Sequence, residues 1–422
     1  MAFFNTPLGM SRRHFLGHMA SSTAVAGSAL AMTRSLEAAS DTLKRNHKSA
    51  ILLWMGGGPP TIDMWDLKPG TPTGGPMQPI STAGDMQICE GLPQLAKHMD
   101  KLSVVRSMST READHTRGRY YMHTGYVPNP NIVHPSYGSV IAHELEDSLS
   151  NLEIPPFVSI GSGSEGPGFL GMAYAPFQVD SNGRIRNLQM PVKSDRMQGR
   201  LAVLDALETR FIKQRRGLPA VDHARVIEKT RSLLTSQQMA AFNVQSEPQS
   251  AKEKYGETGF GRGCLLARRL VESGVPFVEV DFGGWDLHQN CFDRLGQKLP
   301  EMDQAMAALM DDLAQRGLLE DTVVIWMGEF GRTPRINGDA GRDHFARAWS
   351  AVIGGAGLQG GLAIGETSAD GTQVVSEPYS SEDLMATVCH AMGISLQTTF
   401  TSNNGRPMKI AGGGKLIREL TA

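Results

Sequence analysis

The sequence predicts an α/β fold with a mostly parallel central sheet and helices on both of its faces. Three observations predict it: short, continuously apolar runs recur along the chain, segments of helical periodicity separate them, and glycine-rich turns follow several of the runs. Continuously apolar runs are typical of strands buried on both faces, and strands that alternate with helices form parallel sheets. Ligands of such sheets bind beyond the carboxyl ends of the strands.

The first strand is the clearest element in the sequence. It covers residues 49–55 and stops at the turn-forming run Gly56-Gly57-Gly58-Pro59-Pro60. Residues 70–84 are rich in Pro, Gly and Thr and are expected to be irregular, and residues 161–171 form a glycine-rich loop. In this half of the chain we expect strands at 102–106 and 156–160 and helices at 92–99, 114–123 and 137–149.

Residues 200–245 combine helical periodicity with many charges, and the pattern breaks at Gly217-Leu218-Pro219. This stretch predicts two long helices that cover one face of the domain or form a cap. A polar stretch at 247–259 is expected to be a loop or the frayed end of a helix. The remaining expected elements are strands at 275–282, 321–327 and 348–353 and helices at 264–272, 295–316 and 383–392.

The start of the chain predicts export. Arg12 and Arg13 precede Phe15, Leu16 and a weakly apolar, Ala/Ser/Gly-rich run at 19–32. This pattern is typical of a signal that is read by the twin-arginine export machinery, which carries folded proteins. We therefore expect residues 1–40 to be a twin-arginine signal peptide and the protein to reach the periplasm or the cell surface. The alternative is a chance Arg-Arg pair before an amphipathic helix.

Residues 41–422 are expected to form a single α/β domain with a helical insertion at about 198–246. The 41 basic and 43 acidic residues nearly balance, so the composition gives no support for nucleic acid or an anionic membrane as a partner. After the signal, no segment is apolar enough to predict a stable membrane span. The 4 cysteines form no C-x-x-C pair, which argues against a cysteine zinc site.

Polar side chains gather at the ends of the predicted strands. Each of them alone is as well explained as a cap or a turn residue, but several clusters at strand ends favour one polar site at the sheet edge. The clusters are Asp286 and His288 after 275–282, Glu329 and Arg332 after 321–327, Asp343 and His344 before 348–353, His115, Arg117 and Arg119 after 102–106, and Asp63 after 49–55.

Carboxylates and imidazoles at one edge predict a divalent metal site. Mixed Asp, Glu and His ligands suit zinc, manganese or iron better than calcium, which prefers oxygen ligands. A bound metal neutralises phosphate or sulfate oxygens or lowers the pKa of a bound water, and arginines stabilise developing anionic charge. The predicted ligands are Asp286, His288, Glu329, Asp343 and His344, with Asp63 and His115 as further candidates and Arg332 and Arg119 as the arginines.

Several motifs resemble a known family. They are Gly56-Gly57-Gly58-Pro59, the segment from Ile62 to Pro69, Gly328-Glu329-Phe330-Gly331-Arg332-Thr333-Pro334 and Gly341-Arg342-Asp343-His344. With the export signal, they look like the uncharacterised bacterial family numbered 1501 among domains of unknown function, over essentially the whole chain. That family is in turn similar to the alkaline phosphatase and sulfatase superfamily. The resemblance implies an alkaline-phosphatase-like, metal-bearing domain over residues 41–422.

The resemblance to the superfamily implies roles for single residues. Glu329 takes the place of the Asp in the superfamily's Asp-His-Gly motif, and Phe330 replaces its His. His115 falls where the nucleophile of Cys-x-Pro-x-Arg would lie, and Arg119 keeps the Arg of that motif.

The remaining metal residues of the superfamily are also matched only in part. Asp286 and His288 look like a shortened Asp-x-x-x-His metal pair, and His344 looks like the last metal histidine. The usual Asp after the first strand is replaced by glycine, and Asp63 is the candidate to compensate for it.

The resemblance implies hydrolysis of a phosphate or sulfate ester in a small anionic substrate. No formylglycine precursor is present, so a hydrolase of this kind would use metal-activated water, or His115 as a nucleophile or metal ligand. Loss of two expected metal-site residues favours the alternative, a non-catalytic cell-surface or carbohydrate-binding protein on the same fold. A phosphoryl-transferring isomerase is a second alternative.

Overall fold

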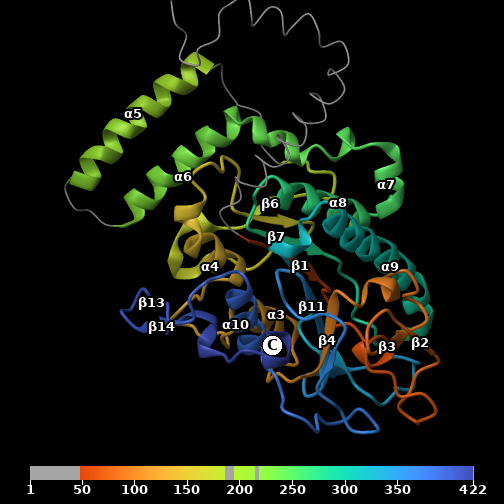
Figure 1. Cartoon of the computed structure of the whole chain (residues 1–422). Helices are drawn as coiled ribbons and strands as arrows, with labels where there is room; N and C mark the ends of the chain where they lie inside the picture. Colours follow the sequence, from red (N-terminus) through yellow and green to blue (C-terminus); the bar gives the residue numbers. More distant parts are fainter. Residues whose placement is uncertain (1–47, 186–193, 214–217, 422) are drawn as a thin grey trace, which may run out of the picture. The chain divides into compact units, whose positions relative to one another are not determined.

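The computed structural model describes residues 48–185, 194–213 and 218–421 (Figure 1). Eight strands pair in one sheet, in the order β12-β4-β11-β8-β1-β7-β5-β6. All of the pairings in this sheet are parallel except the two that β11 makes, with β4 and with β8. The mostly parallel sheet predicted from the sequence is therefore confirmed. The strands are β1 Ser49–Trp54, β4 Leu102–Met108, β5 Phe157–Ile160, β6 Phe177–Val179, β7 Phe277–Asp281, β8 Thr322–Met327, β11 Trp349–Gly354 and β12 Ala363–Ile364.

Alternate residues of β1 show why the strand is apolar throughout. Ile51 and Leu53 belong to one buried cluster, together with residues of helices α8 and α9. Leu52 and Trp54 belong to a second cluster on the other face, together with residues of α3, α4 and α10. Both faces of the sheet are covered by helices, so every side chain of the strand is removed from water.

The helices flank this sheet as the alternating pattern predicted, and Figure 1 shows α8 and α9 side by side. Their bounds are α3 His115–Thr124, α4 Tyr137–Glu144, α5 Ser194–Lys213, α6 Leu218–Thr235, α7 Gln249–Tyr255, α8 Gly259–Glu272, α9 Cys291–Gln315 and α10 Ser381–Ala391. Short 3-10 helices are η1 Thr61–Asp63, η2 Leu95–His98, η3 Glu146–Ser148, η4 Gly168–Leu170, η5 Met172–Tyr174, η6 Gln237–Phe242, η7 Val244–Ser246, η8 Leu319–Asp321, η9 Ile410–Gly413 and η10 Arg418–Leu420. Three antiparallel pairs complete the described elements: β2 Pro79–Ser81 with β3 Gln87–Cys89, β9 Gly331–Arg332 with β10 His344–Phe345, and β13 Thr399–Thr401 with β14 Pro407–Lys409.

Two local predictions were wrong. The stretch expected to be a loop at 247–259 contains α7, whose last residue Tyr255 is buried and donates a hydrogen bond to Asp312 of α9. Burial of that aromatic ring stabilises a short polar helix that the sequence pattern does not indicate. The helix expected at 92–99 is only the 3-10 helix η2. The predicted signal peptide at 1–40 lies outside the described residues.

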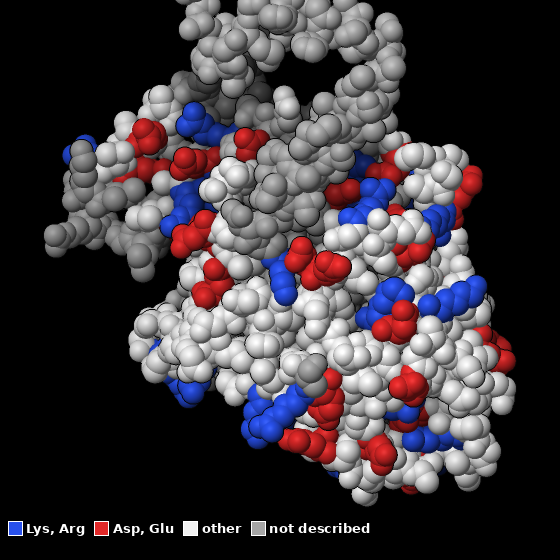
Figure 2. Space-filling view, in the orientation of Figure 1, with Lys and Arg blue, Asp and Glu red and all other residues white. Residues whose placement is uncertain are grey.

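Among the described residues, no helix combines the length and the apolarity needed to cross a bilayer. On the face shown in Figure 2, acidic and basic side chains are interspersed. This mixture agrees with the formal net charge of −2.

A buried ion pair joins the loop after β1 to the loop before β11. Asp63 is 1% exposed and Arg342 is 0% exposed. Arg342 Nε and Nη2 each donate to a different oxygen of Asp63 at 2.7 Å, a bidentate geometry. The same guanidinium donates to the carbonyl oxygens of Thr73 and Thr333 at 3.0 Å. The pair thus fixes two segments that are far apart in the sequence.

Replacement of Asp63 by Asn would leave the buried Arg342 charge without its partner. We expect Asp63→Asn to lower the free energy of unfolding by about 3–5 kcal/mol, measured by urea denaturation. The exposed Asp85→Asn is the control and is expected to change it by less than about 0.5 kcal/mol. Equal stability of the two variants would contradict a structural role for the pair.

Candidate metal centre

The candidate site lies where several loops meet at one edge of the sheet. Strands β1, β4, β7 and β8 run in the same direction, so their carboxyl ends share this edge, and the antiparallel β11 begins there. His115 starts α3 after β4, Asp286 and His288 follow β7, Glu329 follows β8, and His344 lies in β10 shortly before β11. The topology therefore brings distant residues together, as the strand-end rule predicts.

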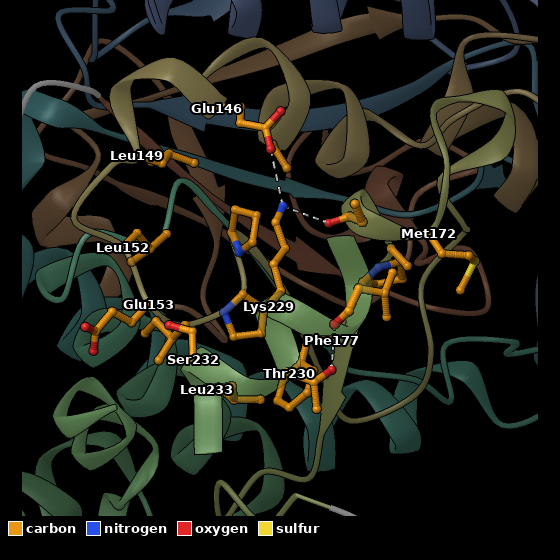
Figure 3. Close-up of a pocket in the computed structure, with 18 residues that line it drawn as sticks. Glu146, Leu149, Leu152, Glu153, Met172, Phe177, Lys229, Thr230, Ser232 and Leu233 are labelled. Carbon is orange, nitrogen blue, oxygen red and sulfur yellow. Dashed lines mark hydrogen bonds and ion pairs between the residues drawn. The ribbon is translucent and has the colours of Figure 1, made fainter. Parts of the chain in front are cut away.

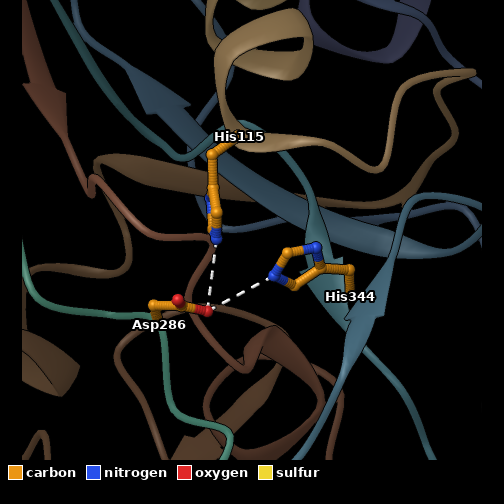
Figure 4. Close-up of side chains that lie close together, drawn as sticks. All are labelled: His115, Asp286 and His344. Atoms are coloured by element: carbon orange, nitrogen blue, oxygen red, sulfur yellow. Dashed lines mark hydrogen bonds and ion pairs between the residues drawn. The ribbon is translucent and has the colours of Figure 1, made fainter.

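One carboxylate oxygen is the centre of the cluster. The Nε2 atoms of His288, His115 and His344 lie 3.0, 3.2 and 3.3 Å from Asp286 Oδ1, and Figure 4 shows two of these contacts. His288 Nε2 and His344 Nε2 are 3.0 Å apart. The ligand atoms of His115, Asp286 and His344 all lie within 4.8 Å of one another. These side chains could hold one metal ion.

Each imidazole is oriented by an oxygen at its other ring nitrogen. The Nδ1 contacts are His115 to Glu329 Oε1 at 2.6 Å, His288 to Asp343 Oδ1 at 2.9 Å, and His344 to the carbonyl oxygen of Ala113 at 2.8 Å. An ionised carboxylate or a carbonyl oxygen only accepts hydrogen bonds, so each Nδ1 carries the hydrogen. In the neutral rings each Nε2 then has a lone pair, and these lone pairs are directed toward the Asp286 cluster.

The donor set fits a divalent cation. Imidazole nitrogens and a carboxylate oxygen are ligands that zinc and similar divalent metals prefer. His115 Nε2 is buried and makes no hydrogen bond. Ligand bonds of about 2.0–2.1 Å in a tetrahedral site separate neighbouring donors by about 3.3 Å. The contacts to Asp286 Oδ1 span 3.0 to 3.3 Å, so they match that separation.

Arg332 supplies a buried positive charge beside the cluster. Its Nη2 donates to Asp286 Oδ1 at 2.6 Å and to the Gly57 carbonyl, and its Nε donates to the Gly58 carbonyl at 2.7 Å. Its Nη1 donates to the Arg342 carbonyl at 3.2 Å. Burial raises the pKa of Asp286, but the hydrogen bond and charge of Arg332 outweigh burial and lower this pKa to about 2. Asp286 therefore stays ionised, and Arg332 holds the loops rather than facing a substrate.

Two glycines let the loop after β1 approach the cluster. Gly57 and Gly58 have φ angles of 112° and 68°, a region that side chains rarely adopt. A Cβ on Gly57 would lie 2.5 Å from the Asp286 nitrogen, and one on Gly58 would lie 2.9 Å from the Phe330 ring. The close approach lets both glycine carbonyls reach Arg332, while Gly57 N donates to Glu329 Oε1 at 2.9 Å.

Phe330 forms an apolar wall behind two of the imidazoles. Its side chain is 0% exposed. Its ring centroid lies 5.1 Å from that of His115 and 4.8 Å from that of His344. Phe330 thus packs against both imidazoles and limits their rotation.

Four of the residues predicted from the sequence do not face Asp286 Oδ1. Glu329 and Asp343 were predicted as ligands, but they lie behind His115 and His288 and orient those rings. Asp63 was also predicted as a ligand, but both of its oxygens are bound to Arg342. Arg119 Nη2 donates to the Gly163 carbonyl, its Nε lies 3.5 Å from Glu165 Oε1, and its guanidinium lies 5.9 Å from the Trp54 ring centroid.

Two groups that orient the histidines carried no signal in the sequence. The Ala113 carbonyl accepts from His344, and a backbone group is independent of residue type. Asn337 Nδ2 donates to Asp343 Oδ1 at 3.2 Å and to the His288 carbonyl at 3.0 Å. Asn337 lies between two motifs in a stretch that reads as a turn, so its contact to the site depends on the folded loop.

The comparisons with known proteins agree with the family that the motifs resemble. Residues 47–421 match the model of a family described as Protein of unknown function (DUF1501). No protein among the curated sequences matches the chain.

Solved structures similar to this chain are distant from it. The PsFucS1 sulfatase from Pseudoalteromonas sp. is 13% identical, with 85% of this chain and 71% of that chain covered and a TM-score of 0.40. A protein in the alkaline phosphatase superfamily from Vibrio parahaemolyticus is 14% identical, with 89% and 70% covered and a TM-score of 0.36. The phosphonate monoester hydrolase SpPMH from Silicibacter pomeroyi is 10% identical, with 88% and 76% covered and a TM-score of 0.37.

The contact with Glu329 sets the charge of His115 in the metal-free protein. The hydrogen bond that His115 Nδ1 donates to Glu329 raises the pKa of His115 and outweighs burial, which lowers it. We expect Glu329→Gln to bring this pKa down toward about 6.5, measured by NMR titration of chelator-treated protein. The exposed Glu320→Gln is the control and should leave the His115 pKa unchanged.

The raised pKa of His115 also makes the stability of the metal-free protein depend on pH. A histidine pKa that is raised on folding contributes stability below the unfolded value, and this contribution is lost as pH rises through the folded pKa. The metal-free parent should therefore exceed Glu329→Gln in stability by more at about pH 6 than at about pH 8. A stability difference between the parent and Glu329→Gln that grows with pH would contradict a raised pKa of His115.

Proposed function

Because this chain belongs to the DUF1501 family, whose description names no activity, we propose a function from its own site: an exported, metal-dependent hydrolase of phosphate or sulfate esters. One divalent cation would be held by His115, Asp286 and His344, with His288 as the adjacent fourth donor. The ester class is supported by the sequence motifs that resemble the alkaline phosphatase and sulfatase superfamily.

The observation that carries the proposal is the convergence of three oriented Nε2 atoms on one ionised carboxylate oxygen. Oxygen acceptors at Nδ1 orient all three rings, so the Nε2 atoms face inward before any ligand arrives. Three imidazole nitrogens with one carboxylate favour zinc or a similar transition metal over magnesium or calcium.

The site is open on one side and closed on the other. The side chains of Asp286 and His288 are 47% and 41% exposed, whereas those of Glu329 and Arg332 are 4% and 0% exposed. A substrate would therefore approach over Asp286 and His288, while the buried groups hold the ligands in place.

A bound cation would supply a Lewis acid for the ester oxygens and a water of lowered pKa. The chain's own residues perform the other tasks. Glu329, Asp343 and the Ala113 carbonyl hold the imidazole rings in the ligating tautomer. Arg332 keeps Asp286 ionised and fixes its position. His288 is placed, half exposed, to bind the cation or to exchange a proton with the leaving group.

Metal analysis tests the proposal directly. Protein purified without chelator should contain about one zinc-class ion per chain, which the double variant Asp286→Ala/His344→Ala should lose. Asp343→Asn should weaken metal affinity by about 10–100-fold, because the Asp343 carboxylate orients His288. The exposed Asp339→Asn, on the same loop, is the matched control.

Loaded protein should hydrolyse p-nitrophenyl phosphate or p-nitrophenyl sulfate, and the double variant should not. Metal-free protein that takes up no divalent cation would overturn the proposal and would favour the non-catalytic binding protein.

Export is supported by the Arg12-Arg13 pair ahead of a weakly apolar run. We expect the double variant Arg12→Lys/Arg13→Lys to remain in the cytoplasm, because the paired arginines are read by a receptor and a lysine keeps only the charge. Cell fractionation followed by immunoblotting measures the outcome. The single Lys44→Arg variant is the control, and export of the double variant at the parent's level would contradict the signal.

A further inference from the structure

A cavity of about 290 Å³ lies at the opposite edge of the sheet from the candidate metal centre. It is bounded by α6, by the segment that leads into β5 and by the start of β6 (Figure 3). Pro155 and Pro156 precede β5, and Phe177 begins β6, so the cavity lies at the amino ends of these strands. It is called the α6 cavity below.

The walls of the α6 cavity are mainly apolar. Val226 and Leu233 line it from α6, Leu149 and Leu152 line it from the segment after α4, and Met172 lies at its rim. Met172 is 62% exposed, and a flexible methionine at the mouth of a cavity adapts to different ligands. The volume is near the lower end of the range for small-molecule sites, which is about 300–1,000 Å³.

Two cations share one carboxylate at the α6 cavity. Lys229 Nζ lies 3.5 Å from Glu146 Oε1, and Arg225 Nη1 lies 3.9 Å from Glu146 Oε2. The Tyr174 hydroxyl donates to the same carboxylate. Burial raises the pKa of Glu146, but the Tyr174 hydrogen bond and the two cations outweigh it and lower the pKa. Glu146 is thus ionised, and the group of three charges carries one net positive charge.

The Lys229 ammonium is only weakly bound by the protein. It lies 3.5 Å from Glu146 Oε1, 3.3 Å from the Ala173 carbonyl oxygen and 5.1 Å from the centroid of the Tyr174 ring. Both hydrogen bonds are longer than charge-assisted hydrogen bonds usually are, at about 2.7–2.9 Å. Figure 3 shows the Lys229 side chain among the lining residues, with the Glu153 carboxylate directed away from the ammonium. An ammonium with spare hydrogens beside apolar walls is suited to an anionic head group.

We infer that the α6 cavity binds a small amphipathic anion, with its apolar body against Val226, Leu152 and Leu233 and its carboxylate or similar head group on Lys229. Because Arg225 shares the Glu146 carboxylate with Lys229, the Lys229 ammonium is only partly neutralised. An apolar wall beside such an ammonium favours an anionic amphiphile over a neutral hydrocarbon or a cation. The inference is independent of the metal centre, because no residue is shared between them.

Isothermal titration calorimetry with octanoate tests the inference. Octanoate should bind with one equivalent per chain, and octylammonium should not bind detectably. Lys229→Met keeps the aliphatic stem and should weaken octanoate binding by about tenfold or more. Lys415→Met, at an exposed lysine elsewhere, is the control and should bind as the parent does. Val226→Trp fills the cavity and should abolish binding.

Circular dichroism establishes that each variant is folded before titration. Lys229→Met and Val226→Trp test the head-group contact and the apolar space separately, so the inference does not depend on a single variant. Chelator-treated protein and the Asp286→Ala/His344→Ala variant should bind octanoate as the parent does, so failure of the metal proposal would leave this result unchanged. Absence of octanoate binding by the parent, or equal binding of octanoate by folded Lys229→Met, would overturn the inference.

Discussion

The buried guanidinium of Arg332 is the interaction on which the candidate metal centre depends. It joins the carbonyls of Gly57 and Gly58 after β1, the carboxylate of Asp286 after β7 and the carbonyl of Arg342 before β11. Arg332 itself pairs with His344 in the short β9–β10 ladder. One side chain therefore sets the relative positions of the loops that deliver the donors. A lysine could not do this, because a point charge lacks the planar array of donors that reaches several acceptors at once.

A second buried arginine supports the first. Arg342 is anchored by Asp63, and its backbone carbonyl accepts a hydrogen bond from Arg332. The two guanidiniums thus form a continuous path from the loop after β1 to the Asp286 carboxylate. Buried charges are tolerated only where they are paired and hydrogen-bonded, and both arginines meet that condition. The path explains why Asp63 is buried with Arg342 instead of serving as a ligand.

The two edges of the sheet carry different chemistry. The carboxyl edge gathers histidines and carboxylates from loops that close strands β4, β7 and β8. The amino edge at β5 and β6 is covered by α6, and its cavity is apolar with a single spare cation. Parallel topology produces this separation, because every loop that follows a parallel strand emerges at the same edge. Helix α6 at the other edge therefore adds a surface that shares no residue with the candidate metal centre.

The sequence by itself determined the α/β class, the strands of the sheet apart from β6 and β12, and several of the residues that meet at its carboxyl edge. Continuous apolar runs such as residues 49–55 are local signals, and the strand-end rule converts them into a site containing Asp286, His288 and His344. Only the tertiary structure decided which side chains contact Asp286 Oδ1 and which ones orient those side chains through hydrogen bonds. Glu329 turns the Nε2 of His115 inward across 214 positions of the chain, and a hydrogen bond over that separation depends on packed strands and not on local periodicity.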